Sequence, residues 1–276
     1  MTSVGDVWIN GEPVPPDHAG VSVFDIGFQR GYGCFEAMRC YNGVPFRLDR
    51  HLTRLSHSAS LLGIPLRSKE QLGDWCLAAT GDQDGVLRVY VTGGVDFARL
   101  GTDNATVILL EALPVVKDSF ALDILDAPWH ADGRQSELSG AKTLSYGPNL
   151  AATMAARARG FDDAVLVGAA GTVLEGPTFS LAWIRDGTVF TPSLSNTILE
   201  SVTREAVLEV AADRGVPVQE GSFPATDLLD ADEVIVMSTV REVRPVHRIG
   251  DRTLSPGGVT QLLRAGFDEL VAAETR

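Results

Sequence analysis

The sequence lacks a hydrophobic run long enough to cross a membrane, since no apolar stretch approaches the ~20 residues that a spanning helix needs. Its first residues, Met1 to Asp6, contain neither the basic nor the apolar region of a signal peptide, and we therefore expect a cytoplasmic protein. The chain has 276 residues, of which 45% are hydrophobic. That length and composition suffice for a large core or for two domains.

Positive charge is scarce. The chain has 23 Lys and Arg residues against 36 Asp and Glu residues, a net charge of −13, which is the wrong sign for general nucleic-acid binding. Cysteine is also rare: Cys34, Cys40 and Cys76 form no CxxC motif and are expected to be reduced thiols. The spacing of His, Cys and carboxylate residues indicates no metal site.

Lysine is the scarcest basic residue, with Lys69, Lys117 and Lys142 as its three examples. A bias in nucleotide composition is the simplest cause of this scarcity of lysine. A lysine in such a chain can nevertheless mark a position where only an amine can react with a carbonyl group. Lys142 lies among small and apolar residues just before a predicted helix, and these surroundings favour a neutral, nucleophilic amine. An ordinary surface lysine is the alternative interpretation.

Hydrophobic periodicity predicts an α+β protein with two domains. Asn10-Gly11 and Asn42-Gly43 are hairpin turn signals. Helices are predicted near 48–62, 69–79, 148–159, 201–214 and 258–274, and strands near 86–92, 106–113, 120–127, 163–168, 179–185 and 233–238. Helices and strands do not alternate regularly, which argues against one doubly wound parallel sheet. We expect a smaller domain over 1–114, a linker over 115–119 and a larger domain over 120–276.

Several polar residues lie where predicted elements begin or end. Glu175 is expected to end a strand before a Gly-Pro break, although a solvated turn residue is the simpler interpretation. Arg54 lies off the apolar stripe of its helix, as a solvated arginine would. Thr203 at a helix start and Ser238-Thr239 at a strand end could offer donors to an anion. With Lys142, these residue types match what a phosphorylated pyridine aldehyde needs.

The sequence resembles the class IV aminotransferases, the fold-type IV pyridoxal-phosphate family. The resemblance covers nearly the whole chain in six blocks that occur in the family's order. They are Gly27 to Arg39, Phe46 to Ala59, Lys142 to Tyr146, Leu174 to Gly176, Ile198 to Arg204 and Met237 to Thr239. Each block alone is a weak signal, and the six together are a strong one.

The resemblance implies a role for each matching residue. Lys142 would hold pyridoxal 5'-phosphate covalently and move the substrate proton, and Glu175 would pair with the pyridine nitrogen. Arg54 would bind the phosphate through two hydrogen bonds. The phosphate cup would be completed by Val202, Thr203, Ser238 and Thr239, and the substrate would be bound by Phe35 and Arg99. The resemblance also implies a homodimer.

The function implied is transamination from a D-amino acid, or from an (R)-amine, to a 2-oxo acid by a ping-pong route. A pyruvate-releasing lyase of the aminodeoxychorismate type and a branched-chain L-amino-acid aminotransferase are the alternatives. A cofactor-free scaffold is a further alternative, against which Lys142, Glu175 and Arg54 argue together. The chain departs from the family's usual pattern at Tyr32, Gly93 and three serine or alanine positions, namely Ser180, Ala182 and Ser201. These departures place the substrate in doubt and remove no chemical essential.

Overall fold

The computed structural model describes residues 3–276, so Met1 and Thr2, which begin the segment searched for a signal peptide, lie outside the described residues. The chain folds into two compact units. Unit 1 consists of Met1–Val115, Ala141–Tyr146 and Ala273–Arg276, and unit 2 consists of Val116–Gly140 and Gly147–Ala272. Both units therefore consist of more than one segment of the sequence. A division of the chain at the single linker 115–119 would instead give two continuous domains. Over the described residues, no helix is both long and apolar enough to cross a membrane.

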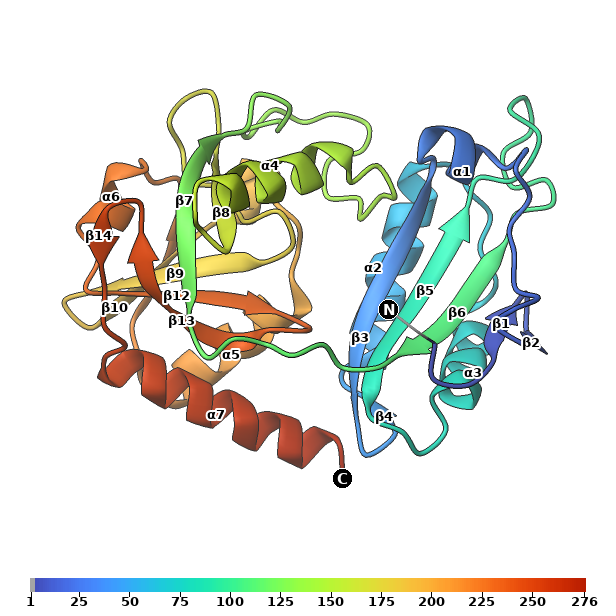
Figure 1. Cartoon of the computed structure of the whole chain (residues 1–276). Coiled ribbons are helices and arrows are strands. Elements are labelled where there is room, and N and C mark those ends of the chain that lie inside the picture. The colour runs from blue at the N-terminus through green and yellow to red at the C-terminus, as the bar shows by residue number, and fades with distance from the viewer. Residues whose placement is uncertain (1–2) are drawn as a thin grey trace. The chain divides into compact units, whose positions relative to one another are not determined.

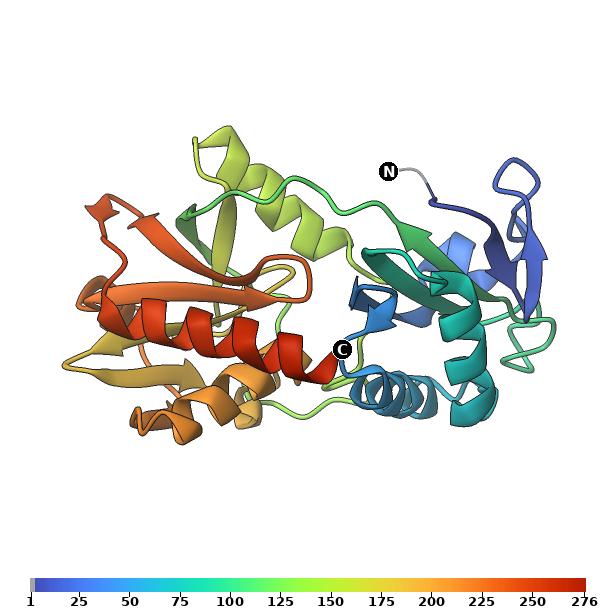
Figure 2. The same cartoon turned by 90° about the horizontal axis from the view of Figure 1, so that it is seen from below.

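Unit 1 is an antiparallel sheet of six strands with α2 and α3 packed on one face (Figures 1 and 2). Its strands, in the spatial order β2-β1-β6-β5-β3-β4, are β1 (Val7–Ile9), β2 (Glu12–Val14), β3 (Gly33–Tyr41), β4 (Val44–Pro45), β5 (Gly85–Thr92) and β6 (Thr106–Glu111). Its helices are α1 (Ile26–Arg30), α2 (Leu48–Leu61) and α3 (Lys69–Thr80).

Local sequence explains the elements of unit 1. The predicted hairpin turns are confirmed, because Asn10 and Asn42 adopt positive φ angles of 52° and 51° between paired strands. The Ser68 hydroxyl caps α3 by accepting a hydrogen bond from the N–H of Gln71. The apolar stripe of α2 is buried against the sheet through Leu52, Leu55 and their neighbours.

Unit 2 contains an eight-stranded mixed sheet in the order β11-β10-β9-β12-β13-β7-β8, with β14 paired to β13. The strands are β7 (Phe120–Asp126), β8 (Asp163–Val167), β9 (Ser180–Arg185), β10 (Thr188–Pro192), β11 (Val218–Gly221), β12 (Glu233–Ser238), β13 (Glu242–Ile249) and β14 (Arg252–Thr253). The helices are α4 (Gly147–Ala158), the 3-10 turn η1 (Leu194–Asn196), α5 (Val202–Asp213), α6 (Thr226–Leu229) and α7 (Gly258–Glu274).

The α+β architecture with two sheets is confirmed, and the predicted helices and strands occur within a few residues of their expected ends. One local expectation is wrong. Glu175 does not end a strand but lies in an irregular segment that makes isolated bridges at Val173 and Gly176. The three cysteines are free and buried, and burial raises the pKa of Cys34 to about 12.

Candidate active site

The main chain of Lys142 is fixed against the first residues of β3. The N–H of Phe35 donates to the carbonyl of Lys142 at 3.0 Å, and the N–H of Leu144 donates to the carbonyl of Gly33 at 2.9 Å. This edge of β3 is available because β4 pairs only with the far end of the strand, at Cys40 and Tyr41. Gly33 allows the close approach, since a Cβ there would lie 2.7 Å from the Leu144 side chain.

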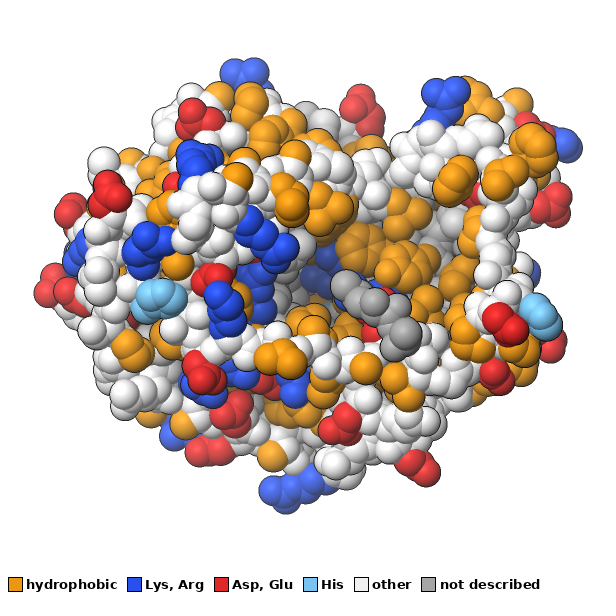
Figure 3. All heavy atoms as spheres, viewed as in Figure 1, with side chains coloured by type: hydrophobic (Ala, Val, Ile, Leu, Met, Phe, Trp, Pro, Cys, Tyr) orange, Lys and Arg blue, Asp and Glu red, His pale blue; other side chains and the backbone are white. Residues whose placement is uncertain are grey.

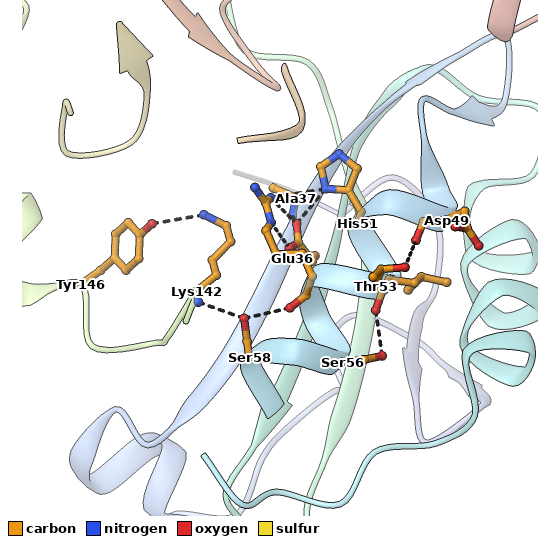
Figure 4. Close-up of polar contacts among 11 residues, drawn as sticks. Glu36, Ala37, Asp49, His51, Thr53, Ser56, Ser58, Lys142 and Tyr146 are labelled. Atoms are coloured by element: carbon orange, nitrogen blue, oxygen red, sulfur yellow. Dashed lines mark hydrogen bonds and ion pairs between the residues drawn. The ribbon is translucent and has the colours of Figure 1, made fainter. Parts of the chain in front are cut away.

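The amine of Lys142 lies beside two aromatic side chains, and Figure 4 shows its contact with Tyr146. Its Nζ donates to the hydroxyl of Tyr146 at 3.1 Å and lies 4.3 Å from the ring centroid of Phe35. The hydroxyl of Ser58 on α2 accepts a hydrogen bond from the Lys142 N–H at 3.0 Å. Main-chain and side-chain contacts therefore both define the position of this amine.

Arg54 is buried, so its interpretation as a solvated arginine is wrong. Its Nε donates to Glu36 Oε1 at 2.6 Å, and its Nη2 donates to Glu36 Oε2 at 2.8 Å. Burial by itself raises the pKa of Glu36, but the charge and hydrogen bonds of Arg54, helped by His51, hold that pKa well below its ordinary value. Glu36 is therefore a carboxylate that binds Arg54 through two hydrogen bonds.

His51 completes this buried cluster. Its Nδ1 lies 2.8 Å from Glu36 Oε2, and because an ionised carboxylate only accepts hydrogen bonds, Nδ1 carries the proton. Burial lowers the pKa of His51, and although Glu36 opposes that effect, Arg54 and Lys142 add to it. His51 is therefore a neutral donor. Figure 4 shows Glu36 on β3 and His51 and Ser58 on α2, close to Lys142.

Glu175 lies in unit 2, in a short segment that follows the edge of β8. Its main chain is held by the N–H of Leu166, which donates to the Glu175 carbonyl at 2.8 Å. Its carboxylate accepts long hydrogen bonds of 3.3 and 3.4 Å from the N–H of Leu199, and His130 Nε2 lies 3.4 Å from Oε1. The N–H of Asp132 donates to His130 Nδ1, so Nε2 carries a proton that faces Glu175.

The four residues assigned to the phosphate cup all lie in unit 2. Val202 and Thr203 form the first turn of α5, whose N–H groups have no acceptor within the helix. Ser201 caps this turn, accepting a hydrogen bond from the N–H of Arg204 at 3.2 Å. Ser238 ends β12, and its hydroxyl accepts a hydrogen bond from the N–H of Arg241 at 3.2 Å.

The two residues assigned to substrate binding differ in their surroundings. Phe35 belongs to an aromatic cluster in which its ring stacks on Tyr90 at 5.9 Å and meets Tyr146 edge to face at 5.2 Å. Arg99 lies in the loop after β5 with its side chain 78% exposed, and it forms a salt bridge of 2.8 Å with Asp96 of the same loop.

Each unit carries groups that a cofactor with an aldehyde, a pyridine nitrogen and a phosphate would need. Unit 1 offers an amine, Lys142, fixed at its main chain and at Nζ. Unit 2 offers a carboxylate, Glu175, oriented by a backbone N–H, together with the capped N-terminus of a twelve-residue helix. The assignment of these individual residues to the cofactor stays a prediction.

Sequence reasoning missed several contacts around these residues. No role was predicted for Tyr146. Glu36 and His51 were not predicted as partners of Arg54, and His130 was not predicted as a partner of Glu175. Glu36, His51 and Ser58 lie within blocks that carried the family resemblance, so that resemblance contained a signal for them. His130 lies outside every block, and only the folded chain places it beside Glu175.

Comparison with known proteins identifies the family. The model of the family "Amino-transferase class IV" matches residues 33–249. A D-alanine aminotransferase of Staphylococcus aureus is 29% identical over 98% of this chain and 99% of its own. A "Probable branched-chain-amino-acid aminotransferase" of Synechocystis is 30% identical over 91% of this chain and 88% of its own.

A solved structure agrees with this assignment. A hypothetical aminotransferase from Mycobacterium tuberculosis in its PLP-bound form has a TM-score of 0.90 and 25% identity, covering 98% of this chain and 99% of that one. The same protein has also been solved with α-ketoglutarate and PMP. The chain described here belongs to the class IV aminotransferases and is a pyridoxal-phosphate-dependent enzyme of fold type IV.

Proposed function

We propose that this aminotransferase moves the amino group of a D-amino acid to a 2-oxo acid by a ping-pong route. The observation that carries the proposal is the position of Lys142, whose amine is hydrogen-bonded to Tyr146 and lies over the ring of Phe35. The D-alanine aminotransferases among the relatives support the choice of D-substrates, since they are 28–30% identical over more than nine-tenths of the chain.

Lys142 is proposed to hold the cofactor and to move the proton of the substrate carbon. When bound, pyridoxal phosphate withdraws electrons from that carbon and so makes the proton removable. The hydroxyl of Tyr146 orients Nζ, and the Phe35 ring excludes water from one side of the amine. Glu175 is proposed to pair with the pyridine nitrogen and hold its proton, with Leu199 and His130 fixing the carboxylate.

The phosphate is proposed to be bound by the first turn of α5, by the Ser238-Thr239 turn and by Arg54. The helix N-terminus supplies N–H groups that have no acceptor within the helix, and a favourable dipole. Glu36 balances the charge of Arg54 and fixes the plane of its guanidinium, which is thereby preorganised.

The substrate side chain is proposed to pack on the aromatic cluster of Phe35, Tyr90 and Tyr146. Such a wall suits apolar side chains. The carboxylate is proposed to be bound by Arg99, whose loop must then exchange the pairing with Asp96 for the substrate. Because Arg99 is exposed, this exchange breaks a surface salt bridge, which contributes little stability.

Transamination of branched-chain L-amino acids is the second candidate. The same apolar wall suits it, and relatives named for branched-chain amino acids reach 30% identity over most of the chain. The fold alone does not decide between the enantiomers, because specificity depends on how individual residues contact the substrate.

Half-reaction spectra decide between the candidates. The protein loaded with pyridoxal phosphate is mixed with D-alanine, L-alanine, L-leucine or (R)-1-phenylethylamine, and loss of the cofactor's visible absorbance is followed. The proposal expects D-alanine to react at least about 10-fold faster than L-alanine, a modest enantiomeric discrimination. A preference for L-leucine would replace the proposal with the second candidate. Release of pyruvate from an aminodeoxychorismate-type substrate, with no amination of the cofactor by any of these donors, would indicate the lyase alternative. Lys142→Ala is the inactive control.

We also propose that the enzyme is a homodimer. Three exposed side chains, Phe24, Phe28 and Phe97, form what we call the phenylalanine patch, with exposures of 71%, 73% and 75%. The residues around them are in contact, since the N–H of Ile26 donates to the Gly94 carbonyl and Arg30 lies 6.0 Å from the Phe97 ring. Figure 3 shows hydrophobic side chains gathered over α1 and the neighbouring loop of unit 1. Exposed aromatic side chains of this kind are typical of protein interfaces.

A further inference from the structure

The turn between β12 and β13 has a backbone conformation that its own sequence does not favour. The residue after the turn, Glu242, has a positive φ of 56°, a left-handed conformation unusual for a residue other than glycine. It pairs with Ser238, and the turn between them carries Thr239, which is assigned to the phosphate cup. A strained turn persists when surrounding contacts hold it in place.

Arg241 supplies such contacts from within the turn itself. Its N–H donates to the Ser238 hydroxyl at 3.2 Å, which closes the turn from inside. Its guanidinium passes into the body of unit 2, where its carbon Cζ lies 4.8 Å from the centroid of the Phe120 ring and 4.5 Å from that of Phe179. Two aromatic rings therefore enclose one cation, an arrangement that stabilises the planar guanidinium.

The guanidinium ends at a buried carboxylate. Arg241 Nη2 donates to Asp163 Oδ2 at 2.5 Å, and the side chain of Asp163 is 2% exposed. The other oxygen of Asp163 accepts hydrogen bonds from the hydroxyl of Thr153 at 2.8 Å and from the N–H of Ala164 at 3.0 Å. Asp163 is therefore a fixed anchor, because α4 and β8 both hold its carboxylate.

The Phe179 ring is fixed as well, and Phe120 is buried. Phe179 is 4% exposed, and its carbonyl accepts a hydrogen bond from the N–H of Gly176 at 2.8 Å. A Cβ at Gly176 would lie 2.1 Å from the Phe179 ring, so the ring has no room to move toward that segment. The Nη1 of Arg241 is buried and has no hydrogen-bond partner among the described residues. The cation therefore depends on Asp163 and on the two rings.

We propose that Arg241 is a positioning residue that holds the Ser238-Thr239 turn in the conformation that binds the cofactor phosphate. The inference rests on the proposed role of that turn in the phosphate cup. The Arg241 side chain acts through its hydrogen bond to Asp163 in the body of unit 2 and does not itself contact the ligand. Lysine cannot replace it, because an ammonium group lacks the planar surface that stacks between two rings and still reaches a carboxylate.

Comparing two ligands that differ only in the phosphate tests this role. Pyridoxal phosphate and pyridoxal are titrated into the cofactor-free protein, and the dissociation constant of each is measured by absorbance. We expect Arg241→Lys to lower the affinity for pyridoxal phosphate at least about 10-fold. Loss of a residue that only supports the ligand-binding groups has an effect of this size at metal sites. The affinity for pyridoxal should stay within about twofold, because pyridoxal makes no phosphate contact. Equal losses for both ligands, or no loss for either, would overturn the proposal.

Arg248→Lys is the matched control. Arg248 lies on β13 and also stacks on an aromatic ring, with Cζ 4.1 Å from the centroid of Phe161, but it lies outside the turn and donates to the carbonyl of Gly160. We expect its variant to bind both ligands as the wild type does. A loss for Arg248→Lys equal to that of Arg241→Lys would also overturn the proposal, since stacking on β13 would then be the cause.

A second variant guards against misfolding. Asp163→Asn keeps the shape of the anchor and removes its charge, and it should reproduce the selective loss for pyridoxal phosphate. Circular dichroism and the melting temperature of each cofactor-free variant establish that it is folded. If the folded wild type binds pyridoxal phosphate no better than pyridoxal, the proposed phosphate cup fails. If the wild type prefers pyridoxal phosphate to pyridoxal, and folded Arg241→Lys and Asp163→Asn show the same preference, Arg241 has no positioning role.

Discussion

At the scale of single residues, a fully buried carboxylate at Glu36 is stable because two side chains of α2 satisfy it. Arg54 neutralises its charge through two hydrogen bonds, and His51 donates a third. Removing one partner of such a pair leaves an uncompensated buried charge, which typically costs about 3–5 kcal/mol. The cluster therefore stabilises unit 1 and fixes the orientation of Arg54 at the same time.

His51 gives this cluster a defined pH dependence. Burial lowers the pKa of His51 below that of a histidine in the unfolded chain, which is about 6.5. The unfolded state then binds a proton that the folded state does not, so the contribution of His51 to stability is present above pH 6.5 and is lost as the pH falls below it. The lowered pKa of Glu36 adds a second loss of the same sign at more acidic pH.

We predict that His51→Gln removes part of this dependence. Glutamine can still donate to Glu36 but does not titrate, so the free energy of unfolding should fall less between pH 7.5 and 5.5 than it does in the wild type. Urea unfolding at a series of pH values measures this slope. His57→Gln, on the exposed side of the same helix, is the control and should keep the wild-type slope. An unchanged slope in His51→Gln would contradict the account.

At the scale of elements, the N-terminus of α5 combines a structural cap with a proposed ligand site. Ser201 accepts the hydrogen bond of the Arg204 N–H and so orders the turn that contains Val202 and Thr203. The cap of α3 has the same form, since Ser68 accepts a hydrogen bond from the N–H of Gln71. The two caps differ in that no cofactor contact is proposed for α3.

We predict that Ser201→Ala and Ser68→Ala each lower the free energy of unfolding by about 0.5–2 kcal/mol. Ser201→Ala should also weaken binding of pyridoxal phosphate, because the first turn of α5 loses its fixed N–H groups, whereas Ser68→Ala should not. Chemical denaturation and cofactor titration measure the two effects. Cofactor affinity that is unchanged in Ser201→Ala would show that this helix N-terminus does not bind the phosphate.

The elements that could be predicted from the sequence are those with strong local signals. The α2 stripe, the Ser68 cap and the two Asn-Gly turns are encoded within a few residues, and the structure contains them. Strand β13 was missed because its sequence, from Glu242 to Ile249, interrupts the apolar residues with arginines and a proline. Its pairing with β12 and β7 is a tertiary effect, which no local pattern contains.

The site shows the same limit. Lys142, Glu175 and Arg54 could be chosen because the family resemblance marks them, and the structure surrounds each with specific partners. The partners themselves come from distant segments: Ser58 lies 84 positions from Lys142, and His130 lies 45 positions from Glu175. Such contacts depend on which distant segments the fold brings together, and a local pattern of residues does not specify this.

At the scale of the whole molecule, the chain forms two units and carries a net charge of −13. Like charges on two copies oppose association, so a stable dimer needs a substantial apolar contact. The phenylalanine patch offers one on unit 1.

We predict a particle of twice the chain mass of 29.4 kDa by sedimentation equilibrium. Phe28→Asp should shift it toward the single-chain mass, because a buried interface does not tolerate an unpaired carboxylate. Leu77→Asp is the control: Leu77 is 51% exposed on α3, outside the patch, and its variant should leave the mass unchanged. A wild type of single-chain mass, or a Phe28→Asp variant that stays dimeric, would contradict the proposed interface.

Covalent labelling tests whether Lys142 is the residue that holds the cofactor. The scarcity of lysine makes the result unambiguous, because Lys69 and Lys117, the two other lysines, pair with Asp49 and Asp162 respectively. The protein is loaded with pyridoxal phosphate, reduced with borohydride and digested, and the labelled peptide is identified by mass spectrometry. We expect one pyridoxyl label per chain, on Lys142, and none in Lys142→Ala. A label on Lys69 or Lys117, or the absence of a label in the loaded wild type, would contradict it.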